Sequence, residues 1–124
     1  MAGNLQELVE QIRQAYAAPH VEQIGALLAD DVHWGEEGTV DQCRNRADVL
    51  AVFARGLSEG VEADLIEVDN GKDGVLCGLD LRWPAEANRP RRIVFHVYRV
   101  EAGRIVEIKA FDDRASAMAS AGMV

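Results

Sequence analysis

The sequence predicts an α+β fold, in which helices from the first half of the chain cover one face of a curved antiparallel sheet formed by the second half. Apolar residues recur every three or four positions as far as Leu57, which is the period of a helix, and alternate from Val61 onward, which is the period of a strand. Two predicted strands meet at the turn Glu101-Ala102-Gly103, and a short glycine-containing turn between such strands is a strong hairpin signal.

Three helices are predicted in the first half. The first begins after Asn4, an N-cap residue, and ends before Pro19, because the residue preceding a proline avoids helical backbone angles. Its apolar stripe comprises Leu5, Leu8, Val9, Ile12 and Tyr16. A second helix is expected from Val21 through Leu28, ending at residues 29–31, followed by a short strand over 32–34 and a loop over 35–39. Residues 47–57 repeat the helical period.

Four strands are expected in the second half, over residues 62–68, 75–83, 92–100 and 104–111. Asn70-Gly71 and Asp73-Gly74 supply turn residues between the first two strands, and the polar segment 84–90 joins the next two. The small-residue tail, 115–124, is expected to begin as a short helix and then to fray.

The strand over residues 92–100 is apolar on both faces. Its two faces carry Ile93, Phe95 and Val97 on one side, and Val94, Tyr98 and Val100, with His96, on the other. A strand of an antiparallel sheet that is apolar on both sides needs two covers. The helices supply one cover, and we expect a second copy of the chain to supply the other, as a homodimer packed through the outer sheet face.

Composition restricts the partners. The chain has 124 residues, which we expect to form a single domain, 1–124. Its net charge of −8 argues against nucleic acid and anionic membranes as partners. No apolar run approaches the roughly 18 residues of a membrane span, and residues 1–14 do not read as a secretory signal, so we expect a cytoplasmic protein. Cys43 and Cys77 are expected to be reduced, and neither a metal nor a cofactor is expected.

Several segments, in this order, resemble the nuclear-transport-factor-2-like superfamily, which includes ketosteroid isomerase, the SnoaL-like polyketide cyclases, limonene epoxide hydrolase and scytalone dehydratase. The resemblance lies in residues 16–18, 28–34, 47–57 and 103–112. It implies a cone-shaped curved sheet wrapped around the N-terminal helices, with a pocket open at one end. Because this fold hosts enzymes and non-enzymes, the resemblance implies a fold more firmly than an activity.

The same resemblance implies a catalytic set. Compared with ketosteroid isomerase, Tyr16 falls at the oxyanion-hole tyrosine, Glu36 at the general-base aspartate and His96 at the second oxyanion donor, a protonated aspartate. Two of these positions therefore hold a different residue type. Compared with limonene epoxide hydrolase, Ala110 replaces a catalytic aspartate on the last strand, so hydrolysis by that route is not implied.

Each candidate has a structural alternative. Glu36 is either a base at the rim of an apolar pocket or a solvated loop residue beside Glu37. Tyr16 is either an oxyanion donor or a core tyrosine. His96 is either a neutral donor to a bound carbonyl or a satisfied core histidine. The expected pocket wall comprises Trp34, Val94, Tyr98, Ile108 and Asp112, and the alternative for Asp112 is an ion pair with Arg114 or a cap for the tail.

Three functions fit these residues. The first is cofactor-free isomerisation, cyclisation or lyase chemistry by proton transfer next to a carbonyl, with a small apolar or carbonyl-containing ligand. The second is non-catalytic binding of such a ligand in the same pocket. The third is a dimeric assembly module with a vestigial, side-chain-filled pocket.

Overall fold

The computed structural model describes residues 5–17, 21–35 and 42–123. The helices in this part of the chain are α1 (Leu5–Ala17), α2 (Val21–Ala26), α3 (Arg46–Ser58) and α4 (Arg114–Ala121), with a 3-10 turn at Ala85–Ala87. The strands are β1 (Leu28–Trp34), β2 (Glu62–Asn70), β3 (Val75–Arg82), β4 (Arg92–Glu101) and β5 (Arg104–Phe111). No helix among the described residues is both long and apolar enough to cross a membrane.

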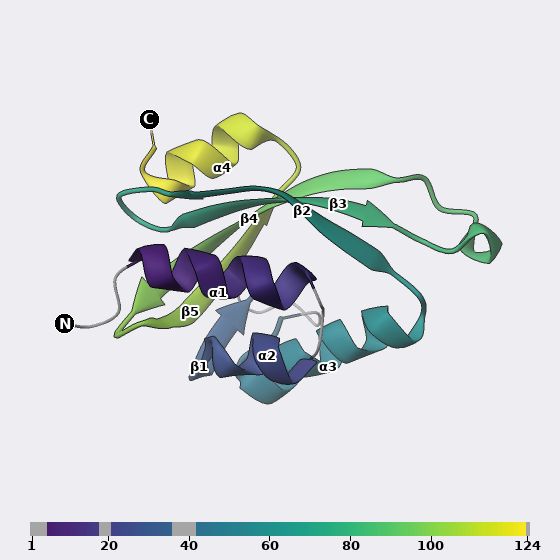
Figure 1. The fold of residues 1–124 in the computed structure, drawn as a ribbon, viewed down its shortest axis with the longest axis horizontal. Helices are drawn as coiled ribbons and strands as arrows, with labels where there is room; N and C mark the ends of the chain where they lie inside the picture. The colour runs from purple at the N-terminus through teal and green to yellow at the C-terminus, as the bar shows by residue number, and fades with distance from the viewer. Residues whose placement is uncertain (1–4, 18–20, 36–41, 124) are drawn as a thin grey trace.

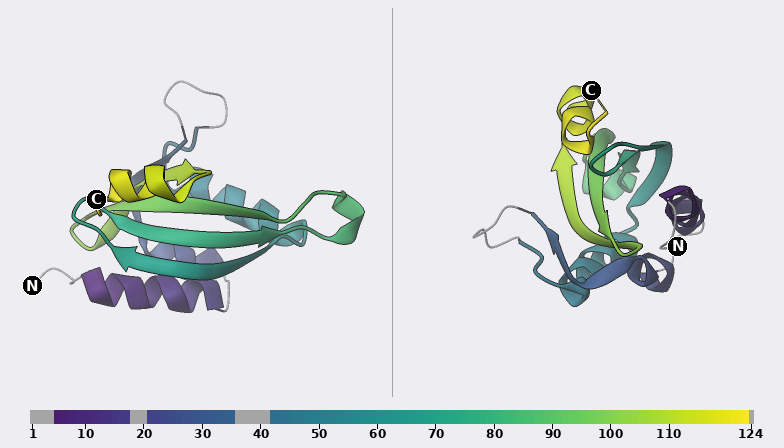
Figure 2. Two further views of the ribbon diagram at one scale, coloured as in Figure 1. Left: turned by 90° about the horizontal axis from the view of Figure 1, so that it is seen from above. Right: turned by 90° about the vertical axis from the view of Figure 1, so that its left-hand side faces the viewer.

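The five strands form one curved, unclosed sheet in the order β1-β5-β4-β3-β2 (Figure 1). Neighbouring strands from β2 to β5 are antiparallel, whereas β1 pairs with β5 in parallel. Helices α1, α2 and α3 gather on the concave side, and α4 lies at the opposite side (Figure 2). This arrangement confirms the predicted α+β cone, with the difference that β1 makes the sheet mixed rather than wholly antiparallel.

Strand alternation divides the core into two. The inner core joins the helices to the concave face, through Leu8, Ile12, Val49, Val75 and Tyr98 among others. The outer core consists of Leu76, Val97, Ala117 and Ala121. Each Å² of apolar surface removed from water stabilises the fold by roughly 25 cal/mol. Because β3 and β4 bury side chains in both cores, both of their faces contribute to the stability of the fold.

The boundary between α2 and β1 differs from the prediction. Helix α2 ends at Ala26, and Leu28 already belongs to β1. Just before this strand, the Leu27 carbonyl oxygen accepts a hydrogen bond from the Ile105 N–H of β5 at 2.8 Å. The pairing of β1 with β5 shifts register between Leu28 and His33, and both Leu28 and Val32 are buried. Their four-residue spacing imitates a helix, and the parallel partner that makes it a strand lies far away in the sequence.

The predicted fraying of the tail is wrong for the residues that the structure describes. The Asp113 side chain caps α4 by accepting from the Ser116 N–H at 2.8 Å, and Gly122 ends the helix with a φ of 74°. Ala117 and Ala121 are fully buried. The small side chains allow α4 to lie close on the outer face of the sheet, so the chain covers part of that face by itself.

Candidate functional site

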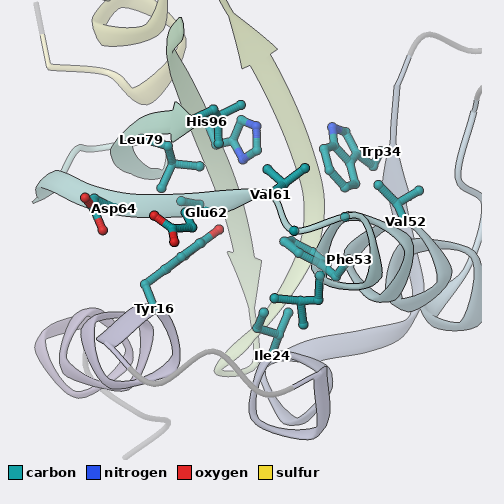
Figure 3. A pocket seen from close by; sticks show the side chains of 15 residues that line it. Tyr16, Ile24, Trp34, Val52, Phe53, Val61, Glu62, Asp64, Leu79 and His96 are labelled. Carbon is teal, nitrogen blue, oxygen red and sulfur yellow. The ribbon is translucent and has the colours of Figure 1, made fainter. Parts of the chain in front are cut away.

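A cavity of about 580 Å³ opens between the helices and the concave face of the sheet (Figure 3). Its wall is mainly apolar and includes Ile24, Trp34, Val52, Phe53, Leu79 and Leu81. Among the helices, α2 supplies Ile24, and α3 supplies four residues, Val52, Phe53, Gly56 and Leu57, from the side that faces the sheet. A volume of this size suits a small organic molecule.

Tyr16 and His96 are hydrogen-bonding side chains that reach this cavity from different elements. Tyr16 projects from α1 and His96 from β4, and both line the hollow (Figure 3). Tyr98 lies behind them, only 3% exposed. Its hydroxyl lies 2.8 Å from the Tyr16 hydroxyl and 3.5 Å from His96 Nδ1. The three side chains therefore form a row, which we name the Tyr16–Tyr98–His96 row, with both ends at the cavity.

Burial keeps the row uncharged at neutral pH. Removal from water lowers the pKa of His96 to about 4, because the imidazolium form loses its hydration. Removal from water also raises the pKa of Tyr16 and of Tyr98 above the ordinary tyrosine value, and the hydrogen bond with Tyr98 partly opposes this for Tyr16. The Trp34 ring meets the His96 ring edge-on at a centroid distance of 5.4 Å. The inner wall thus offers neutral donors and acceptors in apolar surroundings.

Carboxylates occur only at one side of the described wall. Glu62 and Asp64 on β2 line the cavity but are exposed. Arg82 forms a hydrogen bond with Asp64 and lies 3.4 Å from the Glu62 carboxylate. The guanidinium group of Arg82 therefore pairs with both carboxylates. Among the described residues, no group of three or more His, Cys, Asp or Glu side chains is placed to hold a metal ion.

Glu36, the predicted base, lies outside the described residues. The structure does place the residues that flank its segment. Trp34 and Cys43 pair through two backbone hydrogen bonds of 2.9 and 2.6 Å, so both ends of the intervening segment start from the cavity wall at Trp34.

The SnoaL-like domain family matches residues 9–108 of the chain. The chain belongs to the SnoaL-like domain family. Its structural neighbours include Bal32a from a soil-derived mobile gene cassette, at 20% identity and a TM-score of 0.73, with 90% of this chain and 93% of that one covered. No curated protein matches the chain in sequence.

Two further neighbours carry names that bear on chemistry. One is a protein with a ketosteroid isomerase-like fold from Catenulispora acidiphila in complex with trimethylamine, at 16% identity and a TM-score of 0.66, with 95% of this chain and 94% of that one covered. The other is an LEH-like epoxide hydrolase of M. tuberculosis, at 19% identity and a TM-score of 0.64, with 93% and 82% covered. At such identities the likeness shows the fold, and chemistry must be argued from the site.

The structure of this SnoaL-like domain brings together some of the residues predicted for the pocket. Tyr16, Trp34 and His96 line the cavity. Tyr98 and Ile108 border a separate void of about 20 Å³ behind it, to which Tyr16 also contributes.

Val94 and Asp112 lie elsewhere than predicted. Val94 is buried opposite Leu79 in the sheet and does not reach either void. Asp112 is exposed and forms an ion pair with Arg92, not with Arg114. The physical reason is that β5 ends at Phe111, so strand alternation no longer directs Asp112 inward. The cap of α4 is its neighbour Asp113.

Sequence reasoning missed the contribution of α3 and β3 to the wall. Leu79 and Leu81 alternate along a predicted strand, which was a usable signal for an inward face. Val52 and Phe53 are adjacent in the sequence, and only the packing of α3 shows that both reach the cavity. The sequence also indicated that Tyr98 lies beside His96, because residues two positions apart on a strand share one face.

Proposed function

We propose that this SnoaL-like domain binds a small, largely apolar molecule that carries a carbonyl oxygen, and catalyses cofactor-free proton transfer next to that carbonyl. One observation carries the proposal: an apolar cavity of about 580 Å³ has two neutral hydrogen-bonding side chains, Tyr16 and His96, in its wall. A ligand gains binding energy from the apolar wall, and a few placed polar groups fix its orientation.

The proposed roles follow from the chemistry of the groups. A hydroxyl or a neutral imidazole N–H donates to a carbonyl oxygen, and the bond strengthens as negative charge develops on that oxygen. In apolar surroundings, either Tyr16 or His96 supplies such a donor. Glu36 is proposed as the base that removes the carbon-bound proton, because it follows the cavity residue Trp34 by two positions in the sequence.

Non-catalytic binding is the second candidate. The described wall favours it in one respect: its carboxylates, Glu62 and Asp64, are exposed and share Arg82, so neither is a free base inside the cavity. The trimethylamine complex of the Catenulispora acidiphila neighbour is also a case of small-molecule binding in this fold.

Binding is tested with 2-tetralone, an apolar ketone, and tetralin, its hydrocarbon counterpart, by isothermal titration calorimetry. We expect both to bind and the ketone to bind severalfold more tightly, since one hydrogen bond contributes about 1 kcal/mol. Val52→Trp fills the cavity and should abolish binding, whereas Ala51→Trp, at an exposed position beside it on α3, should not. Failure of both probes to bind would contradict the proposal and favour the assembly module.

Catalysis is tested with the same ketone in D₂O. Exchange of its acidic α-protons for deuterium, followed by NMR, should be accelerated by the wild-type protein and reduced to the rate of buffer by Glu36→Gln. Binding without any acceleration would establish the non-catalytic alternative. Acceleration that survives in Glu36→Gln would remove Glu36 from the base role.

We further propose that the chain acts as a homodimer in the cytoplasm, joined through the outer sheet face. Ile66 and Ile93 are 52% and 45% exposed on that face, which is more than large apolar residues usually show. Both cysteines are buried and unpaired, which supports a reducing compartment.

A further inference from the structure

The Tyr16–Tyr98–His96 row has a property beyond the supply of a hydrogen-bond donor to the cavity. Its two ends line the cavity, whereas its middle member, Tyr98, is 3% exposed and lies outside the wall. The Tyr98 hydroxyl contacts only the two end groups among the described hydrogen bonds of its side chain. What a ligand meets at one end therefore depends on the state of the other.

Proton counting makes this dependence explicit. A tyrosine hydroxyl donates one proton, and a neutral imidazole carries one N–H. In the first arrangement, His96 Nδ1–H donates to Tyr98, Tyr98 donates to Tyr16, and the Tyr16 O–H is free to donate into the cavity while Nε2 accepts. In the second, Tyr16 donates to Tyr98, Tyr98 donates to Nδ1, and the cavity meets an Nε2–H donor and a Tyr16 oxygen acceptor.

We propose that Tyr98 couples these ends as a proton relay, so that the cavity takes a conjugated compound presenting a hydroxyl at one end of the row and a carbonyl oxygen at the other, and interconverts its tautomers. The inference rests on the proposed binding of a carbonyl compound in this cavity, and adds to that function a proton transfer between two ligand oxygens in which Glu36 takes no part. It assigns Tyr98 a positioning role and narrows the ligand from any apolar carbonyl compound to a hydroxy-carbonyl compound.

The proposed step balances without any oxidant or added base. The ligand O–H bond breaks as its proton passes to His96 Nε2, and the Nδ1–H proton passes to the Tyr98 oxygen. The Tyr98 proton passes to the Tyr16 oxygen, and the Tyr16 proton forms a new O–H bond at the ligand carbonyl oxygen. The ligand leaves as its tautomer, and the row is left in the second arrangement. The same transfers in reverse restore the first arrangement when hydrogen-bonded water molecules connect the two ends, because they give a proton to the Tyr16 oxygen and take one from His96 Nε2.

Neutrality is what makes a concerted transfer suitable here. A stepwise route would create an imidazolium or a phenolate in apolar surroundings, and burying an isolated charge is costly. Removal from water lowers the pKa of His96 to about 4 and raises the pKa values of both tyrosines, which disfavours those ions. In the concerted step, no member of the row becomes charged.

The coupling is tested in the ligand-free protein by ¹⁵N NMR of labelled histidine, which distinguishes the Nδ1–H from the Nε2–H tautomer. The His96 signal is assigned with His96→Asn. Tyr16→Phe removes one hydroxyl, after which Tyr98 has Nδ1 as its remaining partner and donates to it. We expect the ratio of tautomers to shift towards Nε2–H by about fivefold, as one hydrogen bond would shift it.

Three comparisons make the result specific. In the Tyr98→Phe background, Tyr16→Phe should no longer move the tautomer ratio, because the link is missing. Leu57→Ala, a cavity residue outside the row, should leave it unchanged. Adding 2-tetralone to the wild-type protein should shift His96 towards Nδ1–H, because its carbonyl accepts from Tyr16. This measurement requires no substitution.

An unchanged ratio in Tyr16→Phe, or an equal shift with and without the Tyr98 hydroxyl, would overturn the relay. These outcomes are independent of the binding test for the proposed function. A cavity that binds 2-tetralone while the two substitutions act independently would retain the proposed function without the relay. A coupled row in a protein that binds neither probe would overturn the proposed function and the ligand assigned to the row, while the coupling between Tyr16 and His96 would stand.

Discussion

His96 is a buried imidazole in a position where its charged form is disfavoured. It is 7% exposed, its ring meets the edge of Trp34, and its Nδ1 faces the Tyr98 hydroxyl. The sequence left two roles open for His96, a core histidine with its hydrogen bonds satisfied or a donor to a bound ligand. The structure combines features of both, because one nitrogen contacts Tyr98 while the side chain also lines the cavity.

This burial predicts how stability depends on pH. The unfolded chain binds a proton on His96 near the ordinary value of 6.5, whereas the folded protein does so only at about 4. Above pH 6.5 both states are neutral, and as the pH falls from 6.5 towards 4 protonation favours the unfolded state. We expect the wild-type protein to lose roughly 2 kcal/mol more of its free energy of unfolding between about pH 7 and about pH 4.5 than His96→Asn does.

Urea denaturation at the two pH values measures this difference. His33→Asn is the matched control, since His33 is exposed on β1, and it should retain the wild-type loss. An equal loss in His96→Asn and the wild-type protein would show that His96 does not carry the effect.

At the scale of elements, α4 shows how a weak local signal becomes a stable helix. Its eight residues are too few for an isolated helix to persist in water. It is held by the Asp113 cap and by burial of Ala117 and Ala121 against Leu76 and Val97. Because the fit depends on methyl-sized side chains, α4 is sensitive to added volume at Ala117 and tolerant of it at Ala119, which lies on the exposed side of the helix.

We expect Ala117→Leu to lower the free energy of unfolding by about 1–3 kcal/mol, because extra methylene groups have no space between α4 and the sheet. Ala119→Leu, at an exposed position of the same helix, should change it by less than about 0.5 kcal/mol. Urea denaturation of both variants at neutral pH is the measurement. Equal effects would mean that α4 does not pack closely in solution.

At the scale of the whole molecule, the outer sheet face is covered in part. Helix α4 covers Leu76 and Val97, whereas Ile66 and Ile93 are exposed. Gly78 lies between the Ile66 and Phe95 side chains, where an added Cβ would be 3.3 Å from each, so the open part of the face has a close-packed apolar surface. The ion pair of Asp80 with Arg91 borders it, with Nε 2.7 Å from Oδ1, and Asp80 stands opposite Ile93 in the sheet.

If this open face joins two copies, a charge at its centre should separate them. We expect the wild-type protein to have twice the chain mass of 13.6 kDa by light scattering after gel filtration, and Ile93→Lys to have the mass of one chain, because the lysine ammonium would lose its hydration in the interface and the nearby Asp80 is already paired with Arg91. Leu57→Lys is the control and should remain dimeric. Leu57 is 40% exposed, but it lies at the cavity and not on the outer sheet face. A monomeric wild-type protein would contradict the dimer proposal.

The sequence by itself determined the elements whose signals are local. The strand over 104–111 has the predicted bounds, α3 extends the predicted 47–57 by one residue at each end, and the alternation of β4 correctly places His96 and Tyr98 on one face. These predictions succeed because period, capping and turn chemistry act between residues that are neighbours in the chain. The resemblance to a known superfamily added the cone and selected Tyr16 and His96 as candidates.

The tertiary structure decided what depends on distant partners. Strand β1 begins at Leu28 because β5 pairs with it, and α4 persists because the outer face of β3 and β4 receives it. Asp112 follows the end of β5 at Phe111 and pairs with Arg92 at the surface instead of lining the cavity. The Tyr16–Tyr98–His96 row joins α1 to β4 across 82 positions of the sequence. No local pattern encodes such a contact, since it exists only once the helix has packed against the sheet.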